Sequence, residues 1–145
     1  MDNASQGPRC VFCDIVAGRA PASFVYQDEN AVAFMDIRPV NQGHVLIVPR
    51  AHAATLVELC PDLAAHLMRV GQQMDAALRA SGLPCEGVNL HLADGEAAGQ
   101  DVFHVHLHVI PRFHGDGMHI RANRLSPDTA SLDQAAARIR AALLS

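Results

Sequence analysis

The sequence predicts an α+β fold in which about five short strands and two main helices build one layered domain. Two patterns support this expectation. Polar and apolar residues alternate over residues 104–110, and apolar residues recur at spacings of three and four over residues 61–81. The 145 residues are 50% hydrophobic and 18% charged, so the chain has enough apolar surface for a core. We therefore expect a single domain over residues 10–145, preceded by a polar, flexible N-terminus over residues 1–9.

Three short strands are expected in the first third of the chain, after a short helical turn over residues 10–16. The strands cover residues 24–26, 31–36 and 44–49, and the polar residues 28–30 between the first two are typical of a turn. Strands that follow one another so closely usually pair, so we expect an antiparallel meander.

An amphipathic helix is expected over residues 61–81. Pro61 suits its first turn and Gly82 suits its end. The apolar stripe that would face the core consists of Leu63, Leu67, Val70, Met74 and Leu78.

The second half of the chain predicts two more strands, over residues 88–92 and 102–111. A Gly-rich loop over residues 94–100 separates them. The last expected element is a weaker, Ala-rich helix over residues 131–144.

Composition disfavours several classes of protein. A net charge of −4 and a pI of about 6.1 argue against binding to a nucleic acid polymer, which needs a basic surface. A membrane span needs about 18 consecutive apolar residues, and the densest runs here are far shorter. The N-terminus lacks the apolar segment of a signal peptide, so a cytoplasmic location is expected. In that compartment the four cysteines should be thiols or metal ligands rather than disulfides.

Three of the nine histidines lie at alternate positions of the expected strand over residues 102–111. Alternate side chains of a strand share a face, so His104, His106 and His108 should point the same way, about 6–7 Å apart from one to the next. Imidazole can be a nucleophile, a proton carrier or a metal ligand near neutral pH. The row therefore indicates a metal site, an acid–base and nucleophilic site, or a mixture of the two.

Two further motifs bear on this choice. Cys10 and Cys13 form a Cys-x-x-Cys pair, which is half of a tetrahedral zinc site but can also be redox-active or accidental. Gly99 and Gln100 end the loop before the histidine strand, where backbone N–H groups and an amide could bind phosphate oxygens.

Together these residues resemble the histidine triad (HIT) superfamily, whose signature alternates three histidines with apolar residues as residues 104–110 do. The resemblance covers roughly residues 10–113 and is strongest to a phosphoramidase-like bacterial branch with an N-terminal Cys-x-x-Cys. Its further supports are Asp36, Ile37, Pro39, residues 43–49, His52, Asn89, Gly95 and residues 98–100 and 110–112.

The resemblance implies a HIT-like α+β fold with a five-stranded antiparallel sheet, and a homodimer in which two sheets join into a continuous ten-stranded one. It also implies a site for a purine nucleoside monophosphate. The implied activity is hydrolysis or transfer of a nucleotidyl group at the α-phosphorus, through a nucleotidyl-histidine intermediate. The candidate substrates are adenosine phosphoramidates, aminoacyl adenylates and dinucleoside polyphosphates.

Residue roles follow from the same resemblance. His106 would be the nucleophile, with His108 and His44 beside it as catalytic residues. The nucleotide would contact His106, His108 and a further set consisting of Asp36, Ile37, Asn89, Gly99 and Gln100. Asp36 would bind the ribose hydroxyls, although it could also be a turn-capping acid before Pro39. A structural zinc ion would be held by Cys10, Cys13, His52 and His104, and no organic cofactor is expected.

Two positions depart from the usual pattern of the family. Ala93 stands where many members carry an Asn that contacts phosphate, and Asp101 stands where many carry Ser or Thr. A carboxylate at that position should disfavour polyphosphate leaving groups relative to amines. These departures favour one alternative, a nucleotide-binding or sensing protein with little turnover. A second alternative is a metalloenzyme in which the triad itself binds a catalytic metal.

Overall fold

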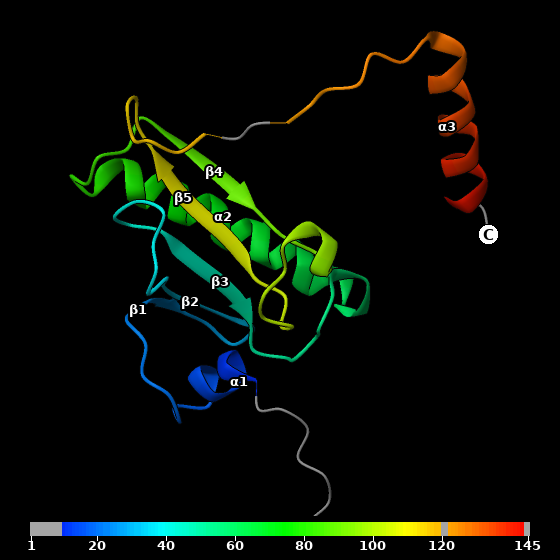
Figure 1. The fold of residues 1–145 in the computed structure, drawn as a ribbon. Coiled ribbons are helices and arrows are strands. Elements are labelled where there is room, and N and C mark those ends of the chain that lie inside the picture. The colour runs from blue at the N-terminus through cyan, green and yellow to red at the C-terminus, as the bar shows by residue number, and fades with distance from the viewer. Residues whose placement is uncertain (1–9, 120–121, 144–145) are drawn as a thin grey trace, which may run out of the picture.

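Five antiparallel strands form the sheet that carries the rest of the fold (Figure 1). The structure is a computed structural model and describes residues 10–119 and 122–143, so the expectation for residues 1–9 lies outside the described residues. The spatial order is β1-β2-β3-β5-β4, and every neighbouring pair is antiparallel. The expected α+β class and the meander of the first three strands are confirmed. The strands are β1 (Phe24–Gln27), β2 (Ala31–Met35), β3 (Val45–Pro49), β4 (Gly87–His91) and β5 (Leu107–Arg112).

Helix α2 (Pro61–Ala80) covers one face of the sheet (Figure 1). Pro61 occupies its first turn and Ser81 follows its last residue, as the sequence predicts. The core between α2 and the sheet combines the predicted stripe of the helix with alternate residues of the strands. Its central members are Ala33, Val45, Ile47, Leu67, Val70, Met74, Leu78, Val105, Leu107 and Val109.

The opposite face of the sheet is covered by the short helix α1 (Val11–Val16). Cys10 caps this helix, because its Sγ accepts the N–H of Cys13 at 3.4 Å. Phe12 and Ile15 of α1 pack against the remaining alternate residues of β2 and β3, which are Val32, Phe34, Leu46 and Val48. Strands β2 and β3 are therefore buried on both faces.

The last strand is shorter than predicted, because β5 begins at Leu107 and not at residue 102. Residues 104–106 precede the ladder, and the N–H of Val105 donates instead to the carbonyl oxygen of Ala53 at 2.9 Å. The expected alternation still holds, since Val105, Leu107 and Val109 all lie in the core under α2. The histidines between them therefore face α1.

Helix α3 (Thr129–Leu143) stands apart from the sheet (Figure 1). It begins two residues earlier than predicted, where Asp128 Oδ1 accepts the N–H of Ser131 at 2.8 Å. None of its residues is buried, and Leu132, Ile139 and Leu143 are exposed. Among the helices described here, none is long and apolar enough to cross a membrane.

Gly43 generates a prediction about stability, because it lies directly before His44 with φ of +100°. A Cβ at this position would lie 3.0 Å from Leu83 Cδ1 and 3.1 Å from Leu78 Cδ2. We expect Gly43→Ala to lower the free energy of unfolding by roughly 2–4 kcal/mol, since crowding adds to the unfavourable backbone conformation. Urea unfolding followed by circular dichroism measures the loss.

Gly82→Ala is the matched control. Gly82 also has positive φ, +82°, but nothing lies within 4 Å of its added Cβ. This variant should lose only the backbone contribution of about 1–2 kcal/mol. If both variants lost the same free energy of unfolding, crowding of the added Cβ at Gly43 would be contradicted.

Candidate functional site

A cavity of about 360 Å³ opens on the α1 face of the sheet. Its apolar wall includes Val11, Phe12, Ile15, Phe34 and Leu46. Its polar lining comes from the residues after β2, from the segment leading into β5 and from β5 itself, and consists of Asp36, Arg38, Asp101, His106 and His108. The cavity therefore places an apolar slot next to two of the triad histidines.

His106 is held in one tautomer by a main-chain group. Its Nδ1 lies 2.8 Å from the carbonyl oxygen of His104, and a carbonyl oxygen can only accept. Nδ1 of the neutral ring must therefore carry the proton, which leaves the lone pair on Nε2. The side chain is 2% exposed, so its position is fixed by the surrounding packing. An unprotonated ring nitrogen in this setting can act as a nucleophile.

His44 and His108 form a chain of hydrogen bonds that fixes two more tautomers. The N–H of Val40 donates to Nδ1 of His44 at 3.1 Å, so the proton of neutral His44 lies on Nε2. That Nε2 proton is donated to Nδ1 of His108 at 2.9 Å. Neutral His108 must then carry its own proton on Nε2, and it offers one N–H donor in the cavity wall.

Burial keeps both rings neutral. It lowers the pKa of His44, although the nearby Asp36 carboxylate opposes the change. Burial also lowers the pKa of His108 to about 4, with further contributions from His106, His44 and His91. At neutral pH both rings are therefore present as the neutral tautomers described above, with the proton on Nε2.

Asp36 makes the turn-capping contact and also lines the cavity, where its predicted contact with ribose stays a prediction. Its Oδ1 accepts the N–H of Arg38 at 2.8 Å, which is the turn-capping contact. Its Oδ2 lies 3.6 Å from Nε2 of His44 and lines the cavity. Ile37, the predicted base contact, is 92% exposed at the same cavity.

Three predicted nucleotide-binding residues lie outside the cavity lining. The amide of Gln100 donates to the carbonyl oxygens of Ala54 and Val102, and its oxygen accepts the N–H of Gly95. Gly99 is exposed in the same loop.

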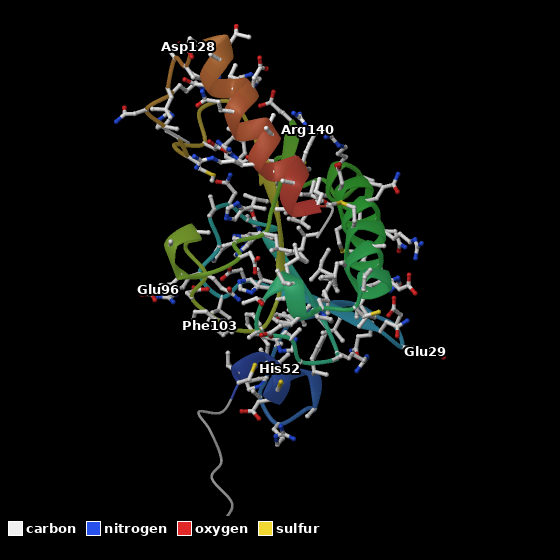
Figure 2. The ribbon with its side chains drawn as sticks, turned by 90° about the vertical axis from the view of Figure 1, so that its right-hand side faces the viewer. Glu29, His52, Glu96, Phe103, Asp128 and Arg140 are labelled. Carbon is white, nitrogen blue, oxygen red and sulfur yellow. The ribbon has the colours of Figure 1, made fainter. Side chains whose placement is uncertain are left out.

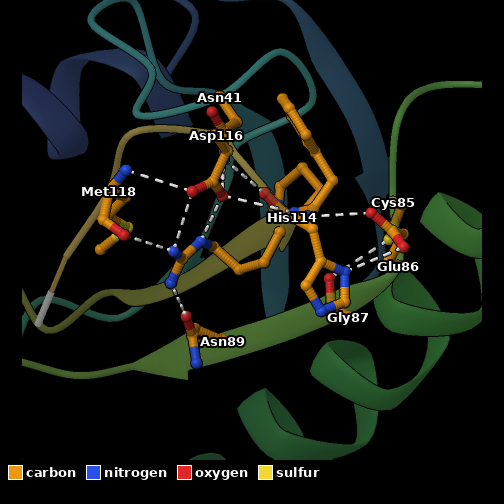
Figure 3. A network of polar contacts seen from close by, with 11 residues as sticks. Asn41, Cys85, Glu86, Gly87, Asn89, His114, Asp116 and Met118 are labelled. Atoms are coloured by element: carbon orange, nitrogen blue, oxygen red, sulfur yellow. Dashed lines mark hydrogen bonds and ion pairs between the residues drawn. The ribbon is translucent and has the colours of Figure 1, made fainter.

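Asn89 lies on β4, where its Oδ1 accepts a hydrogen bond from Arg112 at 2.6 Å (Figure 3). In this structure its side chain, like that of Gln100, supports neighbouring protein segments.

The four predicted metal ligands come together at the start of α1, where His52 lies beside the helix (Figure 2). Nδ1 of His104 lies 3.4 Å from Cys10 Sγ, 3.5 Å from Cys13 Sγ and 3.2 Å from Nδ1 of His52. Cys13 Sγ lies 3.3 Å from Nδ1 of His52. A tetrahedral zinc ion with its usual bond lengths separates its ligand atoms by about 3.3–3.8 Å, so the set fits zinc.

The protonation of these ligands also suits a cation. Nε2 of His104 donates to the carbonyl oxygen of Pro49 at 2.8 Å, which leaves the Nδ1 lone pair directed at the other three ligands. Burial and the neighbouring Cys10 raise the pKa of the Cys13 thiol to about 11, although Arg19 opposes the change. A bound metal ion removes this barrier, because it stabilises thiolates.

The triad histidines therefore do not converge on one metal ion. His104 turns to the cysteines, whereas His106 and His108 line the cavity. A second group that could be considered for metal is Asp36, His44 and His108. In that group Nε2 of His44 carries a proton, so the tautomer imposed by Val40 opposes metal binding there. The geometry supports the mixed interpretation of the histidine row.

Sequence reasoning missed the role of α1. Phe12 lies edge-on to the rings of His104 and His106, with centroids 6.0 and 5.1 Å away, and lines the cavity. Ile15 lies one turn further along the same wall. The signal was present, since Phe12 stands between the two cysteines and Ile15 follows at the helical spacing of three.

Comparisons with known proteins agree with this geometry. The family model described as HIT domain matches residues 17–115. A zinc-bound histidine triad family protein from Mycobacterium smegmatis is 43% identical, with a TM-score of 0.73 over 87% of this chain and 96% of that one.

Two further relatives carry functional descriptions. A histidine triad nucleotide-binding protein from Candida albicans is 28% identical, with a TM-score of 0.85 over 94% of this chain and 98% of that one. An adenylylsulfatase from Arabidopsis thaliana is 39% identical over 71% of this chain and 52% of its own length. Nucleotide-binding and hydrolytic proteins are thus among the relatives.

The lowered pKa of His108 predicts how stability depends on pH. The unfolded chain takes up a proton at the usual pKa of 6.5, whereas folded His108 does so only near 4. Its contribution to the free energy of unfolding is therefore fully present above 6.5 and is lost as the pH falls towards 4. The loss should reach about 3 kcal/mol at most.

Urea unfolding at pH values from neutral to about 4 measures this dependence. His108→Gln should show a shallower fall, because the variant keeps the other titrating groups but lacks the proton that His108 takes up. Parallel pH profiles for the two proteins would show that His108 takes up its proton normally when folded.

Proposed function

Because the chain belongs to the HIT domain family, we propose that it is a nucleotide hydrolase or transferase in which His106 attacks the α-phosphorus of the substrate. The observation that carries the proposal is the lone pair on Nε2 of His106, held at the wall of the cavity by the Nδ1 contact to His104. The substrates are adenosine phosphoramidates, aminoacyl adenylates or dinucleoside polyphosphates. The intermediate is a nucleotidyl group on His106.

In the first step, Nε2 of His106 forms a bond to phosphorus while the bond from phosphorus to the leaving group breaks in line. The leaving group departs with that electron pair, and an amine leaving group also takes up a proton from solvent. The Nε2–H group of His108 donates a hydrogen bond to a nonbridging phosphate oxygen. This hydrogen bond stabilises the negative charge on that oxygen in the transition state. His44 supports this donor because it fixes the tautomer of His108.

The rest of the nucleotide would occupy the same cavity. The Oδ2 atom of Asp36 would accept hydrogen bonds from the ribose hydroxyls. The purine would lie between Ile37 and the apolar wall formed by α1. Contacts from Asn89, Gly99 and Gln100 to the nucleotide remain predictions, and for Gln100 they require its amide to leave the loop carbonyls.

We also propose that one structural zinc ion binds Cys10, Cys13, His52 and His104. When bound, it supplies a cross-link between α1 and the segment that leads into β5. No chemical step involves it.

The assembly that we propose is a homodimer with a ten-stranded sheet. The two edge strands of the sheet are β1 and β4. The pairing of β1 is irregular between Phe24 and Tyr26, and irregular edges resist further pairing. This supports β4 as the edge that meets its counterpart in a second copy.

The alternative is a nucleotide-binding or sensing protein with little turnover. Ala93 and Asp101 favour it, because the first lacks a phosphate donor and the second brings a carboxylate to the cavity. Intact mass spectrometry with an adenosine phosphoramidate distinguishes the two, because only an enzyme that uses His106 gains a nucleotidyl group.

His106→Asn tests the nucleophile. We expect turnover to be abolished while the affinity for adenosine monophosphate stays within about tenfold, since the other groups of the cavity remain. The measurements are product release and calorimetric binding. His114→Asn is the matched control, because the His114 side chain is 94% exposed and lies outside the cavity. Substantial activity in His106→Asn would rule out His106 as the nucleophile.

Cys13→Ser tests the metal. The unaltered protein should carry about one zinc ion per chain, and the variant should lose it together with roughly 5 °C or more of melting temperature. Elemental analysis and thermal unfolding measure the two effects. Cys60→Ser removes an exposed thiol outside the cluster and should change neither. The claim fails if the purified protein lacks zinc and its stability does not respond to a chelator.

A further inference from the structure

Asp101 faces the reacting atom of the proposed nucleophile. Its Oδ1 lies 3.8 Å from Nε2 of His106, and the side chain lines the cavity although it is 75% exposed. The N–H of Val102 donates to the same Oδ1 at 2.9 Å and fixes the orientation of the carboxylate. No protein group in the described part of the chain binds its Oδ2, so this oxygen is open to solvent and to a ligand.

The second half of the proposed reaction needs a proton acceptor. Once phosphorus is bound to Nε2, the His106 ring carries a substituent on each nitrogen, because Nδ1 keeps its proton towards the carbonyl oxygen of His104. The ring is then cationic and a good leaving group. The incoming water must lose a proton as its oxygen bonds to phosphorus.

The other polar groups of the cavity cannot take that proton. His108 presents its Nε2–H donor, because its Nδ1 already accepts from His44. Arg38 only donates. Asp36 uses Oδ1 for the N–H of Arg38, and its Oδ2 is assigned to the ribose hydroxyls in the proposed complex. Among the polar groups that line the cavity, Asp101 is therefore the one left to accept the proton.

We propose that Asp101 is a catalytic residue that accepts the proton of the water that hydrolyses the nucleotidyl-His106 intermediate. This inference rests on the proposed function and deepens it, because it assigns water as the acceptor of the nucleotidyl group. The water oxygen bonds to phosphorus, the bond from phosphorus to Nε2 breaks, and its electron pair returns to Nε2. The proton passes to the Asp101 carboxylate and from there to solvent, to which the side chain is exposed.

The experiment follows the two steps separately with an adenosine phosphoramidate. Quenched samples of the unaltered protein, Asp101→Asn and Asp101→Ala are weighed by intact mass spectrometry during turnover. We expect both variants to form the adduct at a rate within about fivefold of the unaltered protein but to hydrolyse it about 100-fold more slowly. Adduct should therefore accumulate in the variants during steady state.

Two controls separate chemistry from structure. Glu96→Gln removes a carboxylate from an exposed position in the preceding loop, outside the cavity, and should leave both steps unchanged. Formate added to Asp101→Ala should restore part of the lost hydrolysis rate, because a free carboxylate can occupy the vacated position. If Asp101 only supported the local structure, formate would not restore the hydrolysis rate of Asp101→Ala.

The outcomes are distinguishable. Adduct hydrolysis within about twofold of the unaltered protein in both Asp101 variants overturns the inference and leaves the proposed function standing. An equal loss in both steps without rescue by formate overturns it as well. If all three proteins turn over substrate and none forms the adduct, His106 is not the nucleophile. The inference about Asp101 is then overturned as well.

Discussion

Main-chain groups decide which nitrogen of each critical imidazole carries the proton, and the chemistry of the site depends on that choice. The carbonyl oxygens of His104 and Pro49 fix the rings of His106 and His104, and the N–H of Val40 fixes His44 and, through it, His108. Each contact leaves one nitrogen available for a single role, as a nucleophile, as a metal ligand or as a donor. Burial then keeps the His44 and His108 rings neutral, because it lowers their pKa. A histidine row in an unconstrained setting would mix these states.

His104 connects the two centres of the molecule. Its side chain belongs to the candidate metal cluster, whereas its carbonyl oxygen holds the ring of His106, the proposed nucleophile. Phe12 makes a second connection, since it lies between the two cysteines in the sequence and packs on the rings of both His104 and His106. The proposed zinc ion at the start of α1 would therefore also stabilise one wall of the cavity, without taking part in the chemistry.

The sequence predicted features that depend on local periodicity. Alternation placed Val105 in the core and the triad histidines on the other face, and the spacing of Leu67 and Val70 placed α2. Features set by distant partners were harder to predict. The strand was expected from residue 102, but Val105 pairs with the loop at Ala53 and the ladder starts at Leu107. The amide of Gln100 is bound by carbonyl groups of which one, that of Ala54, lies far away in the sequence. The apolar wall supplied by α1 also depends on a distant contact, because only the folded sheet brings Phe12 to His106.

The different roles assigned to the histidines can be tested directly, because each role requires a particular tautomer of the ring. Long-range proton–nitrogen NMR correlations on the zinc-loaded protein at neutral pH distinguish a proton on Nδ1 from one on Nε2. The structure predicts Nδ1–H for His106, and Nε2–H for both His44 and His108. A spectrum in which His106 carries its proton on Nε2 would contradict the account, because the nitrogen assigned to the attack would then have no lone pair to offer.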